Sequence, residues 1–288
     1  MIIPEAKINI MKVAANNGIN MLFVGATGTG KTQAAKEISR LLGKNFFSVS
    51  VNSSHNFRST FFGQYIAKNG TTKFIKSKFI EYISTPNSII LLDEINRGVS
   101  QSIDSLFTIT DPSQKYLDID EIGERIYLAK GTMFIATANI GGEYNTINVG
   151  MAAKNRFLTF EFEYLKEDDE LKLIYSKYPT LKNNKTVPQL IRFANQIRQA
   201  YLNSELDNSI STRYILDYLC VLLSNDCDIT DILEYVIYPS FTTNGNLDDS
   251  DRSKVIKFAQ SMFDVSDNQI NVNSVKNKKS DWSIFDTI

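Results

Sequence analysis

The sequence predicts an α/β fold in which a parallel sheet is flanked by helices and followed by a smaller, all-helical domain. Two patterns support this prediction. In residues 1–163, short apolar runs alternate with helical stretches, as in parallel sheets that are covered on both faces. In residues 164–263, apolar residues recur at helical spacing only. The chain therefore divides into a sheet domain and a helical domain.

Short β-prone runs place the strands of the sheet domain, and helical stretches lie between them. The strands are expected at residues 21–25, 46–51, 88–93, 132–138 and 157–163. The helices are expected at residues 4–15, 31–42, 76–83 and 99–108. Two further segments are expected to form β-hairpins, one at residues 65–74 with its turn at Asn69-Gly70, and one at residues 115–128.

Apolar periodicity predicts the helical domain. One stretch carries the pattern at Val187, Leu190, Ile191, Ala194, Ile197 and Tyr201, and a second carries it at Ile215, Leu219 and Leu222. The tail from residue 264 to residue 288 is rich in Asn, Ser, Lys and Asp, so we expect it to be loosely ordered.

The composition is that of an ordinary soluble protein. The 288 residues suffice for a sizeable core, and 31 Lys and Arg balance 32 Asp and Glu, so no global basic field indicates a nucleic-acid partner. We expect a cytoplasmic protein without membrane contact, because no apolar run approaches the roughly 20 residues of a membrane span and no leader pattern is visible. Cys220 and Cys227 have neither zinc-site nor disulfide spacing, and both are expected to be core residues.

The most specific motif is GATGTGKT, which lies between the first predicted strand and the second predicted helix. It matches the phosphate-binding loop pattern G-x-x-x-x-G-K-[ST] at every fixed position. In such a loop, backbone N–H groups point at a phosphate at the positive end of a helix. Lys31 is expected to contact the β- and γ-phosphates, and Thr32 to hold Mg²⁺. The residues expected to bind the nucleotide are Gly25, Ala26, Thr27, Gly28, Thr29, Gly30, Lys31 and Thr32.

Two adjacent carboxylates end the third predicted strand, in the segment SIILLDEINR. Strand ends of a parallel sheet face the ligand, so Asp93 is expected to hold Mg²⁺ from a second side. Glu94 is expected to orient and deprotonate the water that attacks the γ-phosphate; the alternative is a solvated charge at a strand end. The pair favours hydrolysis over binding alone. No Asn-Lys-x-Asp segment that would read guanine is present, so the nucleotide is expected to be ATP.

Together with FIATAN and NRF further along the chain, these segments resemble an AAA+ ATPase over roughly residues 2–225. The DEINR form and residues 139–157 are similar to the MoxR branch, which includes NorQ/CbbQ-type activators and a cobaltochelatase subunit. The resemblance implies a P-loop NTPase sheet with a helical lid and assembly into a homo-oligomeric ring, a hexamer in this family. The two predicted hairpins match the helix-2 insert and the pre-sensor 1 insert of the branch.

The resemblance also assigns roles to single residues. Asn139 matches sensor 1, which aligns the attacking water, although Asn also favours turns. Arg156 matches the arginine finger that reaches a neighbouring subunit's γ-phosphate; Lys154 lies close enough to be confused with it, and a surface salt bridge is the alternative. Arg213 matches sensor 2.

Arg213 also stands out on physical grounds. It falls in the first turn of a predicted helix that Ser209 or Ser211 would cap, where a positive charge opposes the helix dipole. The alternative is an exposed arginine that is tolerated at a small cost. Asn52, at the end of the second strand, is a candidate for restraining Glu94 until a partner binds. His55 is expected to be a solvated loop residue.

The resulting hypothesis is a Mg²⁺- and ATP-dependent ring that remodels or activates a protein partner. Related proteins act with a von Willebrand factor A protein, and this chain is expected to carry no such domain, so the partner would be separate. One alternative is a McrB-like nucleic-acid motor, in which Lys73, Lys76 and Lys78 line a DNA-facing pore. The other is an ATP-gated scaffold without turnover, which the full set of catalytic candidates disfavours.

Overall fold

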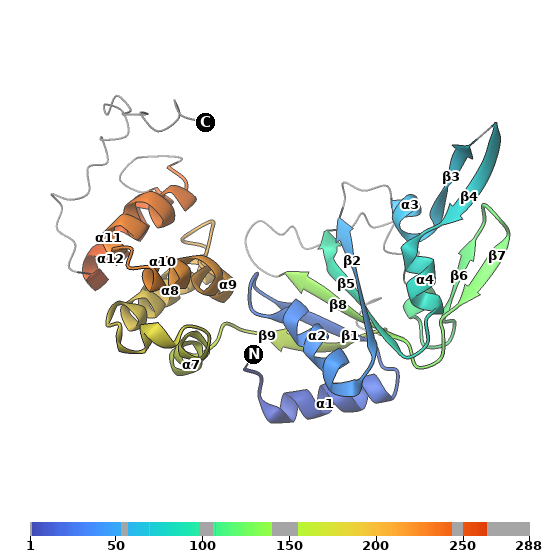
Figure 1. Cartoon of the computed structure of the whole chain (residues 1–288), viewed down its shortest axis with the longest axis horizontal. Coiled ribbons are helices and arrows are strands. Elements are labelled where there is room, and N and C mark those ends of the chain that lie inside the picture. Colours follow the sequence, from blue (N-terminus) through green and yellow to red (C-terminus); the bar gives the residue numbers. More distant parts are fainter. Residues whose placement is uncertain are drawn as a thin grey trace.

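The sheet domain is built on a parallel sheet, as predicted. The computed structural model describes residues 2–52, 57–68, 70–97, 106, 108–139, 155–243 and 250–263. Its main sheet has the strand order β2-β5-β8-β1-β9, and every neighbouring pair runs parallel (Figure 1). The strands are β1 (Met21–Gly25), β2 (Asn45–Asn52), β5 (Ser88–Arg97), β8 (Met133–Asn139) and β9 (Leu158–Phe162).

Both faces of this sheet are covered, which explains the near-continuous apolar strands. Along β5, Ile89 and Leu91 pack in one hydrophobic cluster, whereas Ile90 and Leu92 pack in another. The first cluster includes residues of the helices α1 (Glu5–Asn16) and α2 (Lys31–Leu42). The second includes residues of α3 (Phe57–Phe61) and α4 (Lys78–Ser84). Alternate side chains of a strand point to opposite faces, so a strand buried on both sides must be apolar throughout.

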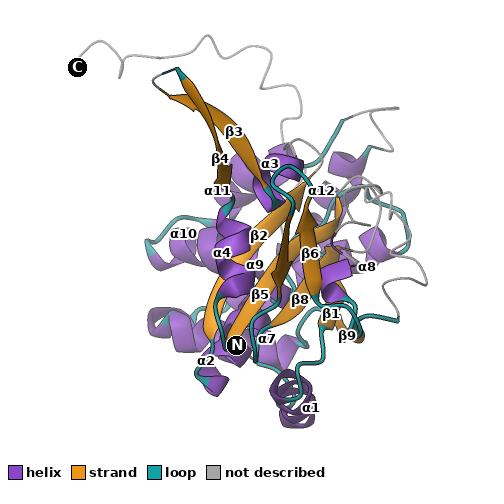
Figure 2. Ribbon diagram, turned by 90° about the vertical axis from the view of Figure 1, so that its right-hand side faces the viewer, coloured by secondary structure: helices purple, strands orange, loops and turns teal. Residues whose placement is uncertain are grey.

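Two hairpins project from the sheet domain at the predicted positions. They are β3 (Gly63–Lys68) with β4 (Thr71–Lys76), and β6 (Tyr116–Ile119) with β7 (Glu124–Tyr127). The hairpins lie side by side in both views of the molecule (Figures 1 and 2). The Tyr65 hydroxyl donates a hydrogen bond of 2.7 Å to the Glu121 carbonyl, and Lys76 forms an ion pair with Glu124. These contacts tie the first hairpin to the second.

The rest of the described chain is helical and has a hydrophobic core of its own (Figure 1). The predicted apolar stripe is buried from Val187 to Ile197, whereas Tyr201 is only partly covered. The α-helices are α7 (Glu167–Lys177), α8 (Thr186–Leu202), α9 (Thr212–Tyr214), α10 (Cys220–Ser224), α11 (Ile229–Ile232) and α12 (Asp251–Phe263). Short 3₁₀ and π turns join them: η1 (Pro179–Asn183), η2 (Ile215–Leu219), η3 (Leu233–Ile237) and η4 (Tyr238–Ser240).

Several predictions about segments need correction or fall outside the described residues. The helix expected from residue 76 begins at Lys78, because Lys76 ends β4 and Ser77 caps the helix by accepting a hydrogen bond from the Ile80 N–H. Cys220 is buried as expected, but Cys227 is exposed. Residues 98–105 and 107, which hold most of the expected helix 99–108, lie outside the described residues, as does the tail 264–288. In the described part, no helix has the length and apolar character needed to cross a membrane.

Candidate functional site

The phosphate-binding loop connects β1 to α2, as its motif requires. Two of its glycines sit where another element leaves no room for a side chain. A Cβ on Gly25 would lie 2.0 Å from the Phe162 carbonyl oxygen of the neighbouring strand. A Cβ on Gly28, whose φ is +77°, would lie 2.3 Å from the Cβ of Ser211 in the helical domain. The tip of the loop therefore touches the lid.

Lys31 is buried inside the loop. Its Nζ donates hydrogen bonds to the carbonyl oxygens of Gly25 (2.9 Å) and Ala26 (2.7 Å). Desolvation lowers the pKa of Lys31 to about 8, the carboxylates of Asp93 and Glu94 within β5 oppose that shift, and the charge of Arg213 adds to it. Lys31 is therefore a buried basic side chain whose hydrogen-bond acceptors are neutral carbonyl groups.

Asp93 lies beside Thr32, as expected for two ligands of one metal ion. The Thr32 hydroxyl is 3.3 Å from Asp93 Oδ1. A hydroxyl and a carboxylate are oxygen ligands of the kind that Mg²⁺ takes alongside nucleotide phosphates and water. The described residues contain no cluster of three or more His, Cys, Asp or Glu suited to a metal ion. The Thr32 hydroxyl and the Asp93 carboxylate form a donor set that fits a Mg²⁺ shared with a nucleotide.

A threonine that the sequence reading missed holds both carboxylate residues in place. The Thr137 hydroxyl, on β8, donates to Asp93 Oδ1 at 2.5 Å and accepts from the Glu94 N–H at 2.8 Å. Glu94 has a left-handed backbone, with φ +58°, which is uncommon for a residue with a side chain. The hydroxyl thus fixes the point where β5 departs from regular strand geometry. The available signal was a polar residue inside an otherwise apolar, fully buried strand.

Asn139 faces Glu94. Its Nδ2 donates a hydrogen bond of 3.0 Å to Glu94 Oε1, and its backbone pairs with Gly25 at the start of the loop. Asn96, noted in the sequence only as part of the DEINR form, binds the backbone of Asn139 with its side chain. The Asn96 Nδ2 donates to the Asn139 carbonyl (3.0 Å), and Asn96 Oδ1 accepts from the Asn139 N–H (3.3 Å). The buried Asn96 side chain therefore fixes the backbone of Asn139, whose side-chain amide lies beside Glu94.

Arg213 reaches the site from the lid. It lies in α9, and Ser211 is the cap, because its Oγ accepts a hydrogen bond of 3.1 Å from the Tyr214 N–H. Ser209, the other expected cap, instead has a buried hydroxyl without a partner among the described residues. The positive charge of Arg213 contributes to lowering the pKa of Lys31, so it acts within electrostatic range of the loop. The structure thus brings Lys31, Asp93, Glu94, Asn139 and Arg213 to one region.

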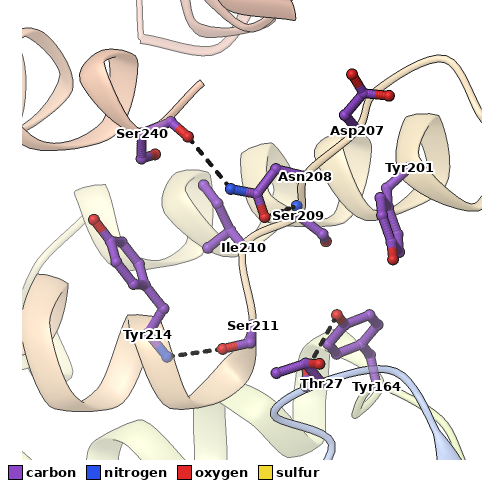
Figure 3. Close-up of a pocket in the computed structure, with 10 residues that line it drawn as sticks. All are labelled: Thr27, Tyr164, Tyr201, Asp207, Asn208, Ser209, Ile210, Ser211, Tyr214 and Ser240. Carbon is purple, nitrogen blue, oxygen red and sulfur yellow. Dashed lines mark hydrogen bonds between the residues drawn. The ribbon is translucent and has the colours of Figure 1, made fainter. Parts of the chain in front are cut away.

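A pocket of about 240 Å³ lies where the lid meets the loop (Figure 3). Thr27 is its one lining residue from the phosphate-binding loop. The Asn208 Nδ2 on one wall donates to the Ser240 carbonyl at 3.3 Å. The lining residues are Thr27, Tyr164, Tyr201, Asp207, Asn208, Ser209, Ile210, Ser211, Tyr214 and Ser240. The pocket therefore borders the loop without including Lys31 or either carboxylate of β5.

Arg156 lies away from the phosphate-binding loop of its own chain. It precedes β9, whose first residue, Leu158, pairs with Met21 at the start of β1, whereas the loop follows the end of β1. Its guanidinium forms an ion pair of 3.3 Å with Asp111. The structure therefore does not bring Arg156 to the site formed by the other candidates. Lys154, His55 and the side chain of Asn52 lie outside the described residues, so the restraint of Glu94 by Asn52 stays a prediction.

Comparison with known proteins identifies the sheet domain. Residues 20–157 match the family model described as the AAA domain of the dynein-related subfamily. This part of the chain is an AAA domain. For residues 20–157, the match confirms the AAA+ resemblance predicted from the motifs, and an AAA domain implies nucleotide binding.

Two curated relatives are similar to this chain over more residues than the family model matches. The chain is 25% identical to Protein NorQ of Paracoccus denitrificans over 210 residues, which are 73% of this chain and 76% of NorQ. It is 27% identical to "Putative chaperone BssE" of Thauera aromatica over 212 residues, 72% of this chain and 70% of BssE. These similarities are consistent with the MoxR and NorQ-like branch. A solved structure of a "putative ATPase" from Cytophaga hutchinsonii aligns with a TM-score of 0.48 and 16% identity, over 77% of this chain and 76% of that one.

Proposed function

We propose that this AAA protein hydrolyses ATP with Mg²⁺ and works as a homo-oligomeric ring, a hexamer by family resemblance, that remodels or activates a separate protein. The hydrogen-bonded arrangement of Thr32, Asp93, Thr137, Glu94 and Asn139 carries the hydrolytic part of this proposal. It places a metal-ligand pair beside a carboxylate with an oriented amide, next to the buried cation of the loop. A site that only bound nucleotide would not need the second carboxylate.

Each residue has a defined task in this proposal. Lys31 exchanges its two carbonyl partners for phosphate oxygens of ATP. Thr32 and Asp93 would hold Mg²⁺, which neutralises phosphate charge when bound. Glu94 accepts a proton from the attacking water, which Asn139 helps to position. Arg213 contacts the γ-phosphate from the lid.

The hairpins support a protein partner over a nucleic acid. Tyr65, Ile66, Ile75 and Tyr127 expose large apolar or aromatic surface there, which suits protein contact. Lys76, one of the three lysines that would line a DNA-facing pore, is paired with Glu124. The name of one relative, "Putative chaperone BssE", agrees with a protein client. By family resemblance, the partner would be a von Willebrand factor A protein.

Replacing Glu94 with glutamine tests the hydrolytic step. Gln keeps the size of the side chain but cannot accept the proton, so Glu94→Gln should bind ATP with unchanged affinity and release phosphate at least about 100-fold more slowly. Phosphate release and ATP binding are measured on the same preparation. Glu234→Gln, which makes the same change in the lid, should behave like the natural protein. Unchanged turnover in Glu94→Gln would remove Glu94 as the base.

A further inference from the structure

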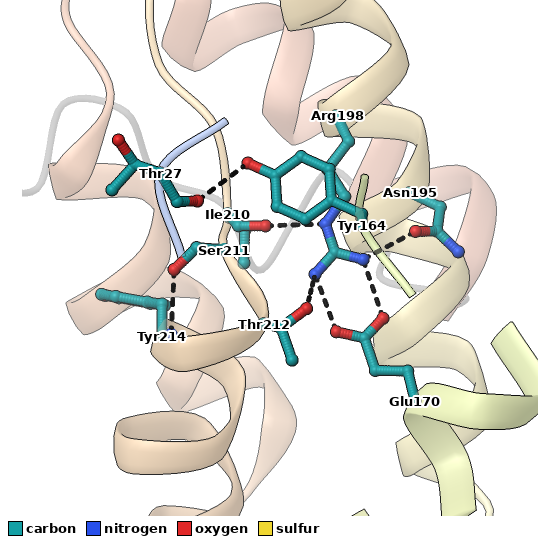
Figure 4. A network of polar contacts seen from close by, with 9 residues as sticks. All are labelled: Thr27, Tyr164, Glu170, Asn195, Arg198, Ile210, Ser211, Thr212 and Tyr214. Atoms are coloured by element: carbon teal, nitrogen blue, oxygen red, sulfur yellow. Dashed lines mark hydrogen bonds and ion pairs between the residues drawn. The ribbon is translucent and has the colours of Figure 1, made fainter. Parts of the chain in front are cut away.

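Tyr164 connects the lid to the phosphate-binding loop through a single hydroxyl. It lies on the segment that joins β9 to α7, where the chain passes from the sheet domain to the lid. Its hydroxyl donates a hydrogen bond of 3.3 Å to the carbonyl oxygen of Thr27 (Figure 4). Its ring packs against the guanidinium of Arg198, 4.4 Å from the ring centre. Tyr164 thus touches the loop at one end and a lid helix along its face.

Arg198 is a lid residue whose charged group is fully enclosed. It is 1% exposed, and its partner Glu170 is 0% exposed. The guanidinium binds both carboxylate oxygens of Glu170, at 2.7 and 2.9 Å. It also donates to the Ile210 carbonyl (2.9 Å), to Asn195 Oδ1 (2.8 Å) and to Thr212 Oγ1 (3.4 Å). These acceptors match the five N–H groups of an arginine side chain.

Two of those acceptors flank the residue that meets the loop. Ile210 and Thr212 lie on either side of Ser211, whose Cβ occupies the space that a Cβ on Gly28 would need. Arg213 follows directly. By donating to Ile210 and Thr212, Arg198 therefore fixes the position of residues 210–212 relative to the phosphate-binding loop, and with it the backbone position of Arg213.

We propose that Tyr164 and Arg198 are positioning residues that form a latch between the phosphate-binding loop and the lid segment that carries Arg213. This inference rests on the proposed function, in which Arg213 contacts the γ-phosphate. A nucleotide bound to the loop shifts the Thr27 carbonyl, and Tyr164, which is hydrogen-bonded to that carbonyl, moves with it. Because the Tyr164 ring packs on Arg198, the movement reaches Arg198, which fixes the position of residues 210–212. A buried ion pair adds little net stability compared with apolar packing, which agrees with a role in setting geometry.

If the latch acts as proposed, breaking it should weaken the preference of the protein for ATP over ADP. Tyr164→Phe is the smallest substitution that tests this. The substitution keeps the ring against Arg198 and removes only the hydroxyl. The ratio of the ADP dissociation constant to that of a non-hydrolysable ATP analogue should fall about threefold, the effect of one modest hydrogen bond, with no loss of thermal stability. A purely structural role would weaken both nucleotides equally and leave the ratio unchanged.

Tyr178→Phe is the matched control. The Tyr178 hydroxyl also donates to a backbone carbonyl, that of Leu216 at 2.7 Å, but this bond lies within the lid. Its removal should leave the ADP to ATP-analogue ratio unchanged. An equal fall in the ratio for Tyr164→Phe and Tyr178→Phe would contradict the latch, because any loosening of the lid would then suffice.

Arg198→Lys tests the lid half of the latch. Lysine keeps a positive charge opposite Glu170, but its three N–H groups cannot serve the five acceptors. The ratio should fall further than in Tyr164→Phe, in a protein whose circular dichroism spectrum and melting curve still show a folded lid. If Arg198→Lys does not fold, the next comparison, which changes only Tyr164 and Arg213, still confirms or overturns the latch.

The effect of Tyr164→Phe in a protein that lacks the Arg213 side chain shows whether the latch acts through Arg213. In an Arg213→Ala background, Tyr164→Phe should cause no further fall in the ratio; a second, independent threefold fall would overturn the inference. Lys31→Met separates this result from the proposed function itself. If the natural protein binds ATP and Lys31→Met does not, an unchanged ratio in Tyr164→Phe refutes the latch alone. If the natural protein binds no ATP, both proposals fail.

Discussion

Lys31 shows how much a single residue of the site depends on its surroundings. Desolvation lowers its pKa to about 8, so the free protein releases the Lys31 proton as the pH rises through that value. A bound phosphate favours the charged form, and binding above about pH 8 must therefore take up a proton. We expect ATP affinity to be constant below about pH 7 and to weaken above about pH 8, by up to about tenfold per pH unit.

Calorimetric titrations with ATP from about pH 6.5 to about pH 9.5 would measure both the affinity and the proton uptake. Lys31→Arg is the control, because arginine stays protonated throughout this range and its affinity, even if weaker, should not fall with pH. A flat profile for the natural protein would contradict a lowered pKa as the factor that governs binding.

At the residue scale, the sequence was sufficient to assign site residues whose relative position is set by one local motif. The loop from Gly25 to Thr32 and the adjacent carboxylates follow from one turn and one strand end. Thr137, Asn96 and Tyr164 could not be assigned in this way, because their partners lie on other elements and the pairing depends on tertiary contacts. Their roles follow from which strands and helices become neighbours.

At the element scale, Asn96 joins the ends of β5 and β8. Without its side chain, the N–H and carbonyl of Asn139 lose their buried partners, and unsatisfied buried groups cost about 1–3 kcal/mol each. Asn96→Ala should therefore lower the free energy of unfolding by about 2 kcal/mol or more and slow phosphate release, because Asn139 carries the amide beside Glu94.

Urea unfolding and turnover measurements would check this expectation. Asn45→Ala is the matched control, because the Asn45 side chain also donates to a backbone carbonyl at a strand end, but in an exposed position. Its effect should stay within about 0.5 kcal/mol. Similar behaviour of the two variants would show that the junction of β5 and β8 does not depend on the Asn96 side chain.

Element identity was more predictable than element boundaries. The hairpins, the main strands and the long helix α8 follow from periodicity. The stretch after Ser211 was expected to be one helix, but it is divided into α9, the π turn η2 and α10. Likewise, β5 continues past Asp93 to Arg97, with an irregular register against β2. The irregularity of β5 coincides with the hydrogen bonds of Thr137, which are tertiary contacts that a local pattern does not contain.

At the scale of the whole molecule, the strand order creates the site. The sequence predicted a parallel sheet, but not that β1 lies between β8 and β9. This order puts Asn139 beside Gly25 at the carboxyl ends of β8 and β1, whereas Arg156 precedes β9 and lies near the amino ends of the strands. A catalytic role for Arg156 therefore requires a second subunit whose phosphate-binding loop faces the amino ends of these strands.

Subunit mixing tests this requirement. Arg156→Ala should bind ATP normally but lose turnover by about 10³-fold or more, the scale of an arginine finger. Lys31→Met subunits are inactive but keep Arg156, so mixing them with Arg156→Ala subunits should restore up to about a quarter of the natural rate in randomly assembled rings. Arg192→Ala, which breaks an exposed ion pair with Glu167, should keep full activity. If all mixtures stay inactive while size-exclusion chromatography shows intact assemblies, Arg156 does not act across a subunit boundary.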